Sequence, residues 1–155
     1  MNPLVELVAR RVALGDLVAA AKFGTTVPID DPYRERSLLR QVIGLSAKRG
    51  IDPAFIDRFF RAQIEANKAV QRSLHALWKV EPGRRPARRP DLAREVRPQL
   101  DQLTTAILDE LAKDRSTIAR TRLGVVELRA ATQAADGIHR DAILIALTPL
   151  CDVGA

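Results

Sequence analysis

The chain has 155 residues, of which 46% are hydrophobic and 28% charged, and its formal net charge is +6. This length fits one domain, whose core can bury roughly 68–70% of the surface of the unfolded chain. We therefore expect a single domain over residues 1–155. The composition argues against a disordered chain, and no apolar run approaches the roughly 20 residues that a membrane-spanning helix needs.

The positive charge favours an anionic partner, which would be a nucleic acid, an anionic membrane or a small polyanion, although many proteins carry such charge for solubility alone. Cys151 is the only cysteine, so neither an intrachain disulfide nor a cysteine metal cluster can form. His75 and His139 are the only histidines. We therefore expect no metal site.

The first residues do not read as a secretion signal. Glu6, Arg10 and Arg11 interrupt what would have to be a continuous apolar region. Two alternatives stay open on this ground: a cytosolic protein, or the mature chain of an exported one.

Two Asp-Pro pairs mark helix starts. Aspartate accepts hydrogen bonds from the unpaired amides of a first turn, and proline fits the first helical position. Asp31-Pro32 therefore opens a helix that runs to about Arg49, where Gly50 favours a stop. Asp52-Pro53 opens a longer helix to about Trp78, with these core candidates: Phe55, Ile56, Phe59, Phe60, Ile64 and Val70.

Apolar spacing predicts the remaining helices. The first runs from about Pro3 to Phe23, and a loop follows over 24–30. Residues 79–90 are rich in proline and arginine and cannot be helical over most of their length. Two helices around 116–135 and 139–150 complete an all-α domain, a bundle of about six helices.

The start of the helix after residue 90 is ambiguous. Asp91 could cap it, whereas Pro98 disfavours a helical conformation at Arg97, which would delay the start to that point.

Several polar residues lie on otherwise apolar helix faces. Arg11 and Lys22 are eleven residues apart, which is three helical turns, so they share one face. Asn67 and Gln71 are four apart and share another. The others lie in the first turn of the second helix or at the start of the fourth: Asp31, Arg34, Glu35 and Arg97.

Gathered inside a bundle, these side chains would form a cavity suited to a small dicarboxylate that also carries a hydroxyl group and an uncharged oxygen. Arginine offers forked, permanently charged donors that match carboxylates. Taken singly, each of these residues is equally compatible with a solvated surface, and Lys68 is most simply a solvent-facing lysine.

The ordered set resembles the AroQ class of chorismate mutases, over nearly the whole chain from Arg11 to about Cys151. In that class an arginine of the first helix is followed eleven residues later by a catalytic lysine, then nine further on by an aspartate, and then by Arg-Glu. The segments 51–53, 63–71 and 96–98 are similar to those of the exported subclass.

The resemblance implies three catalytic residues. Lys22 and Gln71 would donate to the ether oxygen of the breaking carbon–oxygen bond. Glu35, with the backbone carbonyl of Asp31, would hold the ring hydroxyl.

It also implies the residues that bind the rest of the substrate. Arg11 and Arg97 would bind the carboxylates, with Arg34 contributing to one of them, and Arg97 would come from the same chain. Asn67 would add a polar contact near the carboxylate end.

The implied reaction is the sigmatropic (Claisen) rearrangement of chorismate to prephenate, a step of aromatic amino-acid biosynthesis that needs no cofactor or metal. A homodimer is expected, with no nucleic-acid or membrane partner. The subclass implies a periplasmic or secreted location, with a cytoplasmic one as the alternative. Cys151 has no partner for the C-terminal disulfide that some exported relatives carry.

Two other functions compete with this interpretation. An isochorismate-pyruvate lyase of the same fold would have nearly the same pocket. A basic helical module could instead bind nucleic-acid phosphates through the arginines of the proline-rich segment and its neighbour: Arg84, Arg85, Arg88, Arg89 and Arg94.

Overall fold

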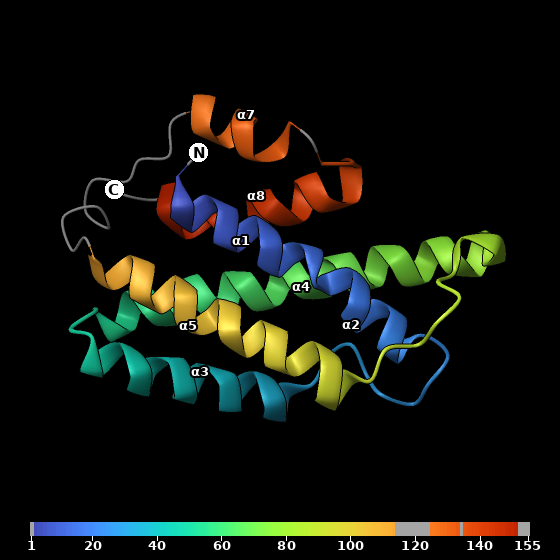
Figure 1. Cartoon of the computed structure of the whole chain (residues 1–155), viewed down its shortest axis with the longest axis horizontal. Helices are drawn as coiled ribbons and strands as arrows, with labels where there is room; N and C mark the ends of the chain where they lie inside the picture. Colours follow the sequence, from blue (N-terminus) through green and yellow to red (C-terminus); the bar gives the residue numbers. More distant parts are fainter. Residues whose placement is uncertain (1, 114–124, 134, 152–155) are drawn as a thin grey trace.

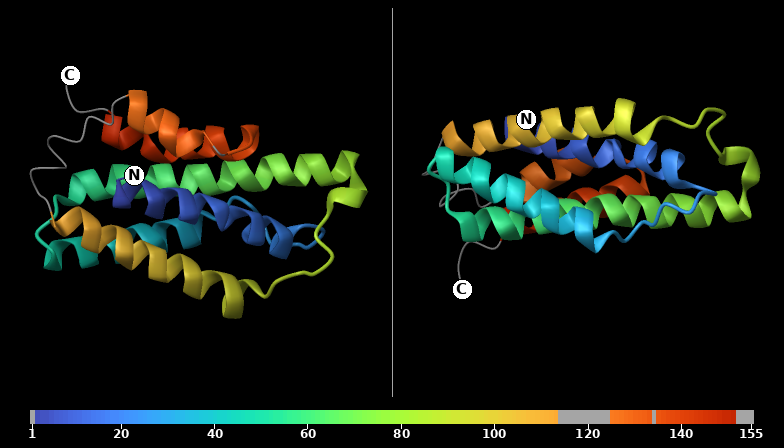
Figure 2. Two further views of the ribbon diagram at one scale, coloured as in Figure 1. Left: turned by 45° about the horizontal axis from the view of Figure 1, so that its top comes forward. Right: turned by 90° about the horizontal axis from the view of Figure 1, so that it is seen from below.

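The computed structural model describes residues 2–113, 125–133 and 135–151, and every regular element among them is a helix, as predicted (Figure 1). The longest helix, α4, contacts helices on several sides, and Figure 2 shows the others arranged along it. The principal helices are α1 (Pro3–Ala13), α2 (Gly15–Lys22), α3 (Pro32–Lys48), α4 (Pro53–Val80), α5 (Arg97–Lys113), α7 (Val125–Thr132) and α8 (Gly137–Cys151).

Both Asp-Pro pairs start helices, as predicted. The Asp31 carboxylate accepts a hydrogen bond from the amide of Arg34 at 3.1 Å, and that of Asp52 accepts one from the amide of Ala54 at 3.2 Å. α3 ends at Lys48 and is followed by Gly50 at φ +68°, a conformation that favours glycine. α4 runs two residues further than expected, to Val80.

The first predicted helix is divided in two. α1 and α2 meet at Leu14, next to Gly15, where a Cβ atom would lie 3.0 Å from the Cβ of the buried Val70. The glycine therefore permits a close approach between α2 and α4. α2 packs along the half of α4 that carries Gln71, where a nitrogen of the His75 ring also lies 2.9 Å from the carbonyl oxygen of Ala19.

The segment before α5 contains two short turns, η1 (Pro82–Arg84) and the π-helical η2 (Leu92–Val96). The Asp91 side chain caps η2 by accepting from the amide of Arg94 at 2.9 Å. α5 begins at Arg97, the later of the two expected starts, but the reason given for it was wrong: Arg97 is itself helical, with φ −59° and ψ −41°. Pro98 lies in the first turn of α5, where its missing N–H group costs no hydrogen bond.

The core candidates of the long helix are all buried, with Phe59, Phe60 and Ile56 fully inaccessible. Gln63 lies among them and donates its side-chain amide to the carbonyl of Ala146 at 3.0 Å, which joins α4 to α8. α8 matches the helix predicted at 139–150. Of the helix predicted at 116–135, only α7 is described, and the proposed start at residue 116 lies outside the described residues.

Candidate active site

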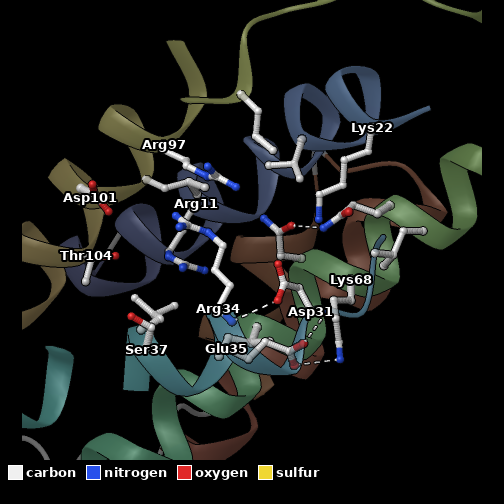
Figure 3. Close-up of a pocket in the computed structure, with 18 of the residues that line it drawn as sticks. Arg11, Lys22, Asp31, Arg34, Glu35, Ser37, Lys68, Arg97, Asp101 and Thr104 are labelled. Carbon is white, nitrogen blue, oxygen red and sulfur yellow. Dashed lines mark hydrogen bonds and ion pairs between the residues drawn. The ribbon is translucent and has the colours of Figure 1, made fainter. Parts of the chain in front are cut away.

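A cavity of about 160 Å³ lies between α2, α3, α4 and the start of α5. Arg11, near the C-terminal end of α1, also lines it. Figure 3 shows this cavity with the side chains around it. Residues of five helices, distant in sequence, therefore surround one space. All eight residues singled out from the sequence line it: Arg11, Lys22, Asp31, Arg34, Glu35, Asn67, Gln71 and Arg97.

Arg11 is a buried cation that forms no ion pair with any residue the structure describes. Only 5% of the residue is exposed, and its Nε atom has no hydrogen-bond partner among the described residues. Burial lowers the pKa of Arg11 to about 10, and the nearby carboxylate of Asp101 offsets part of that effect. Burying a charged group while one of its N–H donors makes no hydrogen bond is costly. An anionic group placed in the cavity would remove that cost.

Two further arginines join Arg11 at the same side of the cavity, as Figure 3 shows. Arg34 projects from the first turn of α3, and Arg97 is the first residue of α5. Burial lowers the pKa of Arg34, and the charge of Arg97 lowers it further. Mutual repulsion of this kind favours the binding of an anion with more than one negative charge.

Lys22 reaches the cavity from the opposite side (Figure 3). It is the last residue of α2. Burial lowers the pKa of Lys22, and the guanidinium groups of Arg97 and Arg34 act in the same direction. Lys22 is thus a partly desolvated donor, which makes a stronger hydrogen bond than the same group in water.

Gln71 lies beside Asn67 on α4, as the four-residue spacing predicted. Gln71 is 3% exposed, and its Nε2 atom donates to the side-chain oxygen of Asn67 at 2.6 Å. Nε2 carries a second N–H group, while the Oε1 atom of Gln71 has no partner among the described residues. The pair thus presents an amide with unused hydrogen-bonding capacity to the cavity.

Glu35 and Asp31 form a reciprocal cap at the start of α3. The Glu35 carboxylate accepts from the backbone amide of Asp31 at 2.9 Å, and the carbonyl of Asp31 accepts from the amide of Glu35 at 2.9 Å. The other oxygen of Glu35 accepts from the ammonium group of Lys68 at 3.0 Å. These contacts fix the carboxylate at the cavity wall, where its oxygens can accept hydrogen bonds.

Lys68 is not the solvent-facing lysine that the sequence suggested. Its side chain is 12% exposed and forms ion pairs with Asp30 at 2.9 Å, Glu35 at 3.0 Å and Glu65 at 3.2 Å. Burial lowers the pKa of Lys68, but the hydrogen bonds to these three carboxylates outweigh it and raise the pKa above its ordinary value. Lys68 therefore joins α4 to the loop before α3.

Sequence reasoning also missed Asp101 and Thr104, which line the cavity from α5. Both lie on the same face as Arg97, at spacings of four and seven residues, so the helical period could have indicated them. Asp101 tempers the positive charge, since its carboxylate acts on both Arg11 and Arg34.

The charge of the lining is unequal. Five basic and three acidic side chains line the cavity, which leaves an excess of two positive charges. No group of three metal-ligating side chains occurs in the described part of the chain. The excess of positive charge suits a small ligand with two carboxylate groups. The cavity also contains a lysine and a neutral amide, which can donate hydrogen bonds to an oxygen that lies between the two carboxylates of such a ligand.

The family described as "Chorismate mutase type II" matches residues 2–72. A secreted chorismate mutase from Mycolicibacterium smegmatis is 34% identical over 154 residues, which cover 96% of this chain and 84% of the relative. The chain belongs to the chorismate mutase family. Its activity is accordingly that of a chorismate mutase.

Solved structures agree with this assignment. The crystal structure of chorismate mutase from Burkholderia thailandensis is 34% identical and superimposes with a TM-score of 0.82, each chain being covered to 96%. The chorismate mutase from Burkholderia phymatum is 28% identical and gives a TM-score of 0.87, with 97% of this chain and 94% of that one covered. These structural matches also cover the last helices of the chain, which lie beyond residues 2–72 of the family match.

The arginines of the 81–91 connection already have partners within the chain, which argues against the nucleic-acid interpretation. Arg84 pairs with Glu81, and Arg88 pairs with Glu95 through two hydrogen bonds of 2.8 and 3.0 Å. Arg89 donates to backbone carbonyls. In the part of the chain that the structure describes, no helix has the length and apolar character to cross a bilayer.

Proposed function

We propose that this chorismate mutase rearranges chorismate to prephenate in the cavity of Figure 3, with three arginines binding the two carboxylates. Arg11 and Arg97 make the principal contacts, and Arg34 contributes to one of them. Asn67 adds a polar contact at the carboxylate end. The observation that carries the proposal is the buried side chain of Arg11, whose Nε atom has no hydrogen-bond partner among the described residues and which lines a cavity with an excess of two positive charges.

The rearrangement requires that the flexible enolpyruvyl side chain be held over the ring in its reactive conformer. Arginines that hold both carboxylates restrict that side chain, which converts a rare conformer of free chorismate into the bound one. No nucleophile or acid–base relay takes part, since one carbon–oxygen bond breaks while one carbon–carbon bond forms within the same molecule. Catalysis then depends on geometry and on the charge that develops at the ether oxygen.

Lys22 and Gln71 stabilise that charge. Negative charge grows on the ether oxygen as the carbon–oxygen bond lengthens, so fixed donors bind the transition state more tightly than the substrate. The donors are the ammonium group of Lys22, which lies across the cavity from the arginines, and the second N–H group of the Gln71 amide. Glu35 and the carbonyl of Asp31 accept from the ring hydroxyl and fix the ring.

The test compares the purified protein with Lys22→Ala. Loss of chorismate is followed by its absorbance, and the product is identified by chromatography. We expect kcat/KM to fall by about 100-fold or more in the variant, the effect of removing one preorganised donor. Lys79→Ala, which removes an exposed lysine of α4, is the matched control and keeps the activity of the parent.

The same assay distinguishes the lyase. Chorismate that stays intact while isochorismate yields salicylate and pyruvate would assign the cavity to that elimination instead. Activity that survives in Lys22→Ala would leave the reaction in place but remove Lys22 from it.

We also propose that the protein acts outside the cytoplasm, as a homodimer. The relative that is 34% identical over 154 residues is named a secreted chorismate mutase, which supports the first part. Fractionation of cells that express the complete gene tests it, with activity expected in the periplasm or the medium. Sedimentation at several protein concentrations tests the dimer.

A further inference from the structure

The position of Lys22 depends on how the end of α2 is held. The helix ends at Lys22, and Phe23 already has a non-helical backbone with φ −58° and ψ 128°. The last carbonyl groups of a helix have no partner within it. The side chain of a lysine at this position keeps a fixed direction only if other groups bind those carbonyls and restrain the backbone.

Arg89 binds the two carbonyls on either side of Lys22. Its Nη1 atom donates to the carbonyl of Ala21 at 3.1 Å and to that of Phe23 at 2.7 Å. The carbonyl of Lys22 itself accepts from the amide of Thr25 at 3.0 Å and from its hydroxyl at 2.6 Å. A cation at the carboxyl end of a helix also interacts favourably with the helix dipole.

Arg89 belongs to the connection 81–91, which leaves the end of α4, crosses the end of α2 and leads to α5 (Figure 2). The guanidinium of Arg85 lies 5.8 Å from the centre of the Phe23 ring. Phe23 itself packs edge-on against Trp78 of α4, with ring centres 5.3 Å apart. The connection and α4 thus contact Phe23 on two sides. Arg89 restrains the backbone on both sides of Lys22, because it binds the carbonyls of Ala21 and Phe23.

We propose that Arg89 is a positioning residue for catalysis, which holds the backbone around Lys22 so that its ammonium group stays directed at the reacting ether oxygen. This inference rests on the proposed role of Lys22. Arg89 is not among the residues that line the cavity, so it does not contact a substrate bound there. It acts through Lys22 alone.

The expected kinetic signature follows from that separation. In Arg89→Gln we expect kcat to fall roughly tenfold, because a small misplacement of a catalytic donor weakens transition-state binding. KM should change by less than about twofold, since the arginines that bind the carboxylates are untouched. Arg89→Lys keeps a cationic donor within reach of the carbonyls and should recover part of kcat.

Arg84→Gln is the matched control. Arg84 lies in the same connection, carries the same charge and pairs only with the nearby Glu81 among the described residues. It should keep the kcat and KM of the parent. Thermal melting followed by circular dichroism checks that every variant is folded at the assay temperature.

The double variant Lys22→Ala/Arg89→Gln decides whether Arg89 acts through Lys22. If it does, adding Arg89→Gln to Lys22→Ala causes no further loss, because the group that it positions is gone. A further tenfold loss in that background, or an unchanged kcat in Arg89→Gln alone, would overturn the inference. Full activity in Lys22→Ala would instead refute the role proposed for Lys22, so the two failures are distinguishable.

Discussion

Gln71 carries an amide where a carboxyl group would be nearly isosteric, and this choice sets the response of the site to pH. An amide donates a hydrogen bond at any pH, whereas a carboxyl group donates only when protonated. Gln71 is buried beside Asn67. The amide member of the donor pair proposed for the ether oxygen therefore does not change its protonation state with pH.

We expect kcat/KM of the parent to vary little between about pH 5 and 8, because the amide of Gln71 donates a hydrogen bond at any pH. In Gln71→Glu the activity should fall as the pH rises through the pKa of the new carboxyl group, since only its protonated form donates. Initial rates at constant ionic strength over this range test both statements. A steep loss between pH 5 and 7 in the parent would contradict the role of Gln71.

At the scale of elements, His139 joins the start of α8 to the start of α2. Its Nε2 atom lies 2.6 Å from a carboxylate oxygen of Asp16, and its Nδ1 atom lies 2.7 Å from one of Asp136. Both nitrogens can donate only in the imidazolium form. Although burial lowers the pKa of His139, the hydrogen bonds to Asp16 and Asp136 outweigh it and raise the pKa above its ordinary value.

This contact should make stability depend on pH. Because the pKa is higher in the folded state, the contribution is fully present below about pH 6.5 and is lost as the pH rises through the raised pKa. We expect His139→Gln to lower the free energy of unfolding by roughly 0.5–1 kcal/mol at pH 6, the value of a partly exposed ion pair, and by less at high pH. Urea unfolding of both proteins at several pH values measures the difference. A difference that stays constant with pH would show that the contact does not depend on protonation.

At the scale of the whole molecule, one chain supplies a complete cavity. The arginines come from α1, α3 and α5, and the donors come from α2 and α4. The residues proposed for binding and catalysis all belong to this one chain. Assembly and catalysis should therefore be separable properties of this protein.

Specific activity should accordingly stay constant when the enzyme is diluted through the concentration at which a dimer would dissociate. Rates measured over at least about a thousandfold range of protein, with the mass followed by sedimentation, test this expectation. A loss of specific activity that tracks dissociation would mean that the partner contributes to the site or to its stability.

Several features of this protein could be predicted from the sequence because they depend on residues close together in the chain. The two Asp-Pro starts could be predicted because each cap joins atoms only two or three residues apart. The shared helix face of Asn67 and Gln71 follows from the helical period, and the family resemblance added the roles. The sequence thus predicted eight of the residues that line the cavity but missed Lys68, Asp101 and Thr104.

Only the tertiary structure decided the division at Leu14, the ion pairs of Lys68 and the contact of Arg89 with the end of α2. Each depends on atoms brought together from distant parts of the chain: Lys68 and Glu35 are 33 residues apart, and Arg89 and Phe23 are 66 apart. The sequence by itself does not show whether a lysine or arginine side chain faces solvent or contacts a partner inside the protein. Its role is set by which carboxylate or carbonyl the packed helices place beside it.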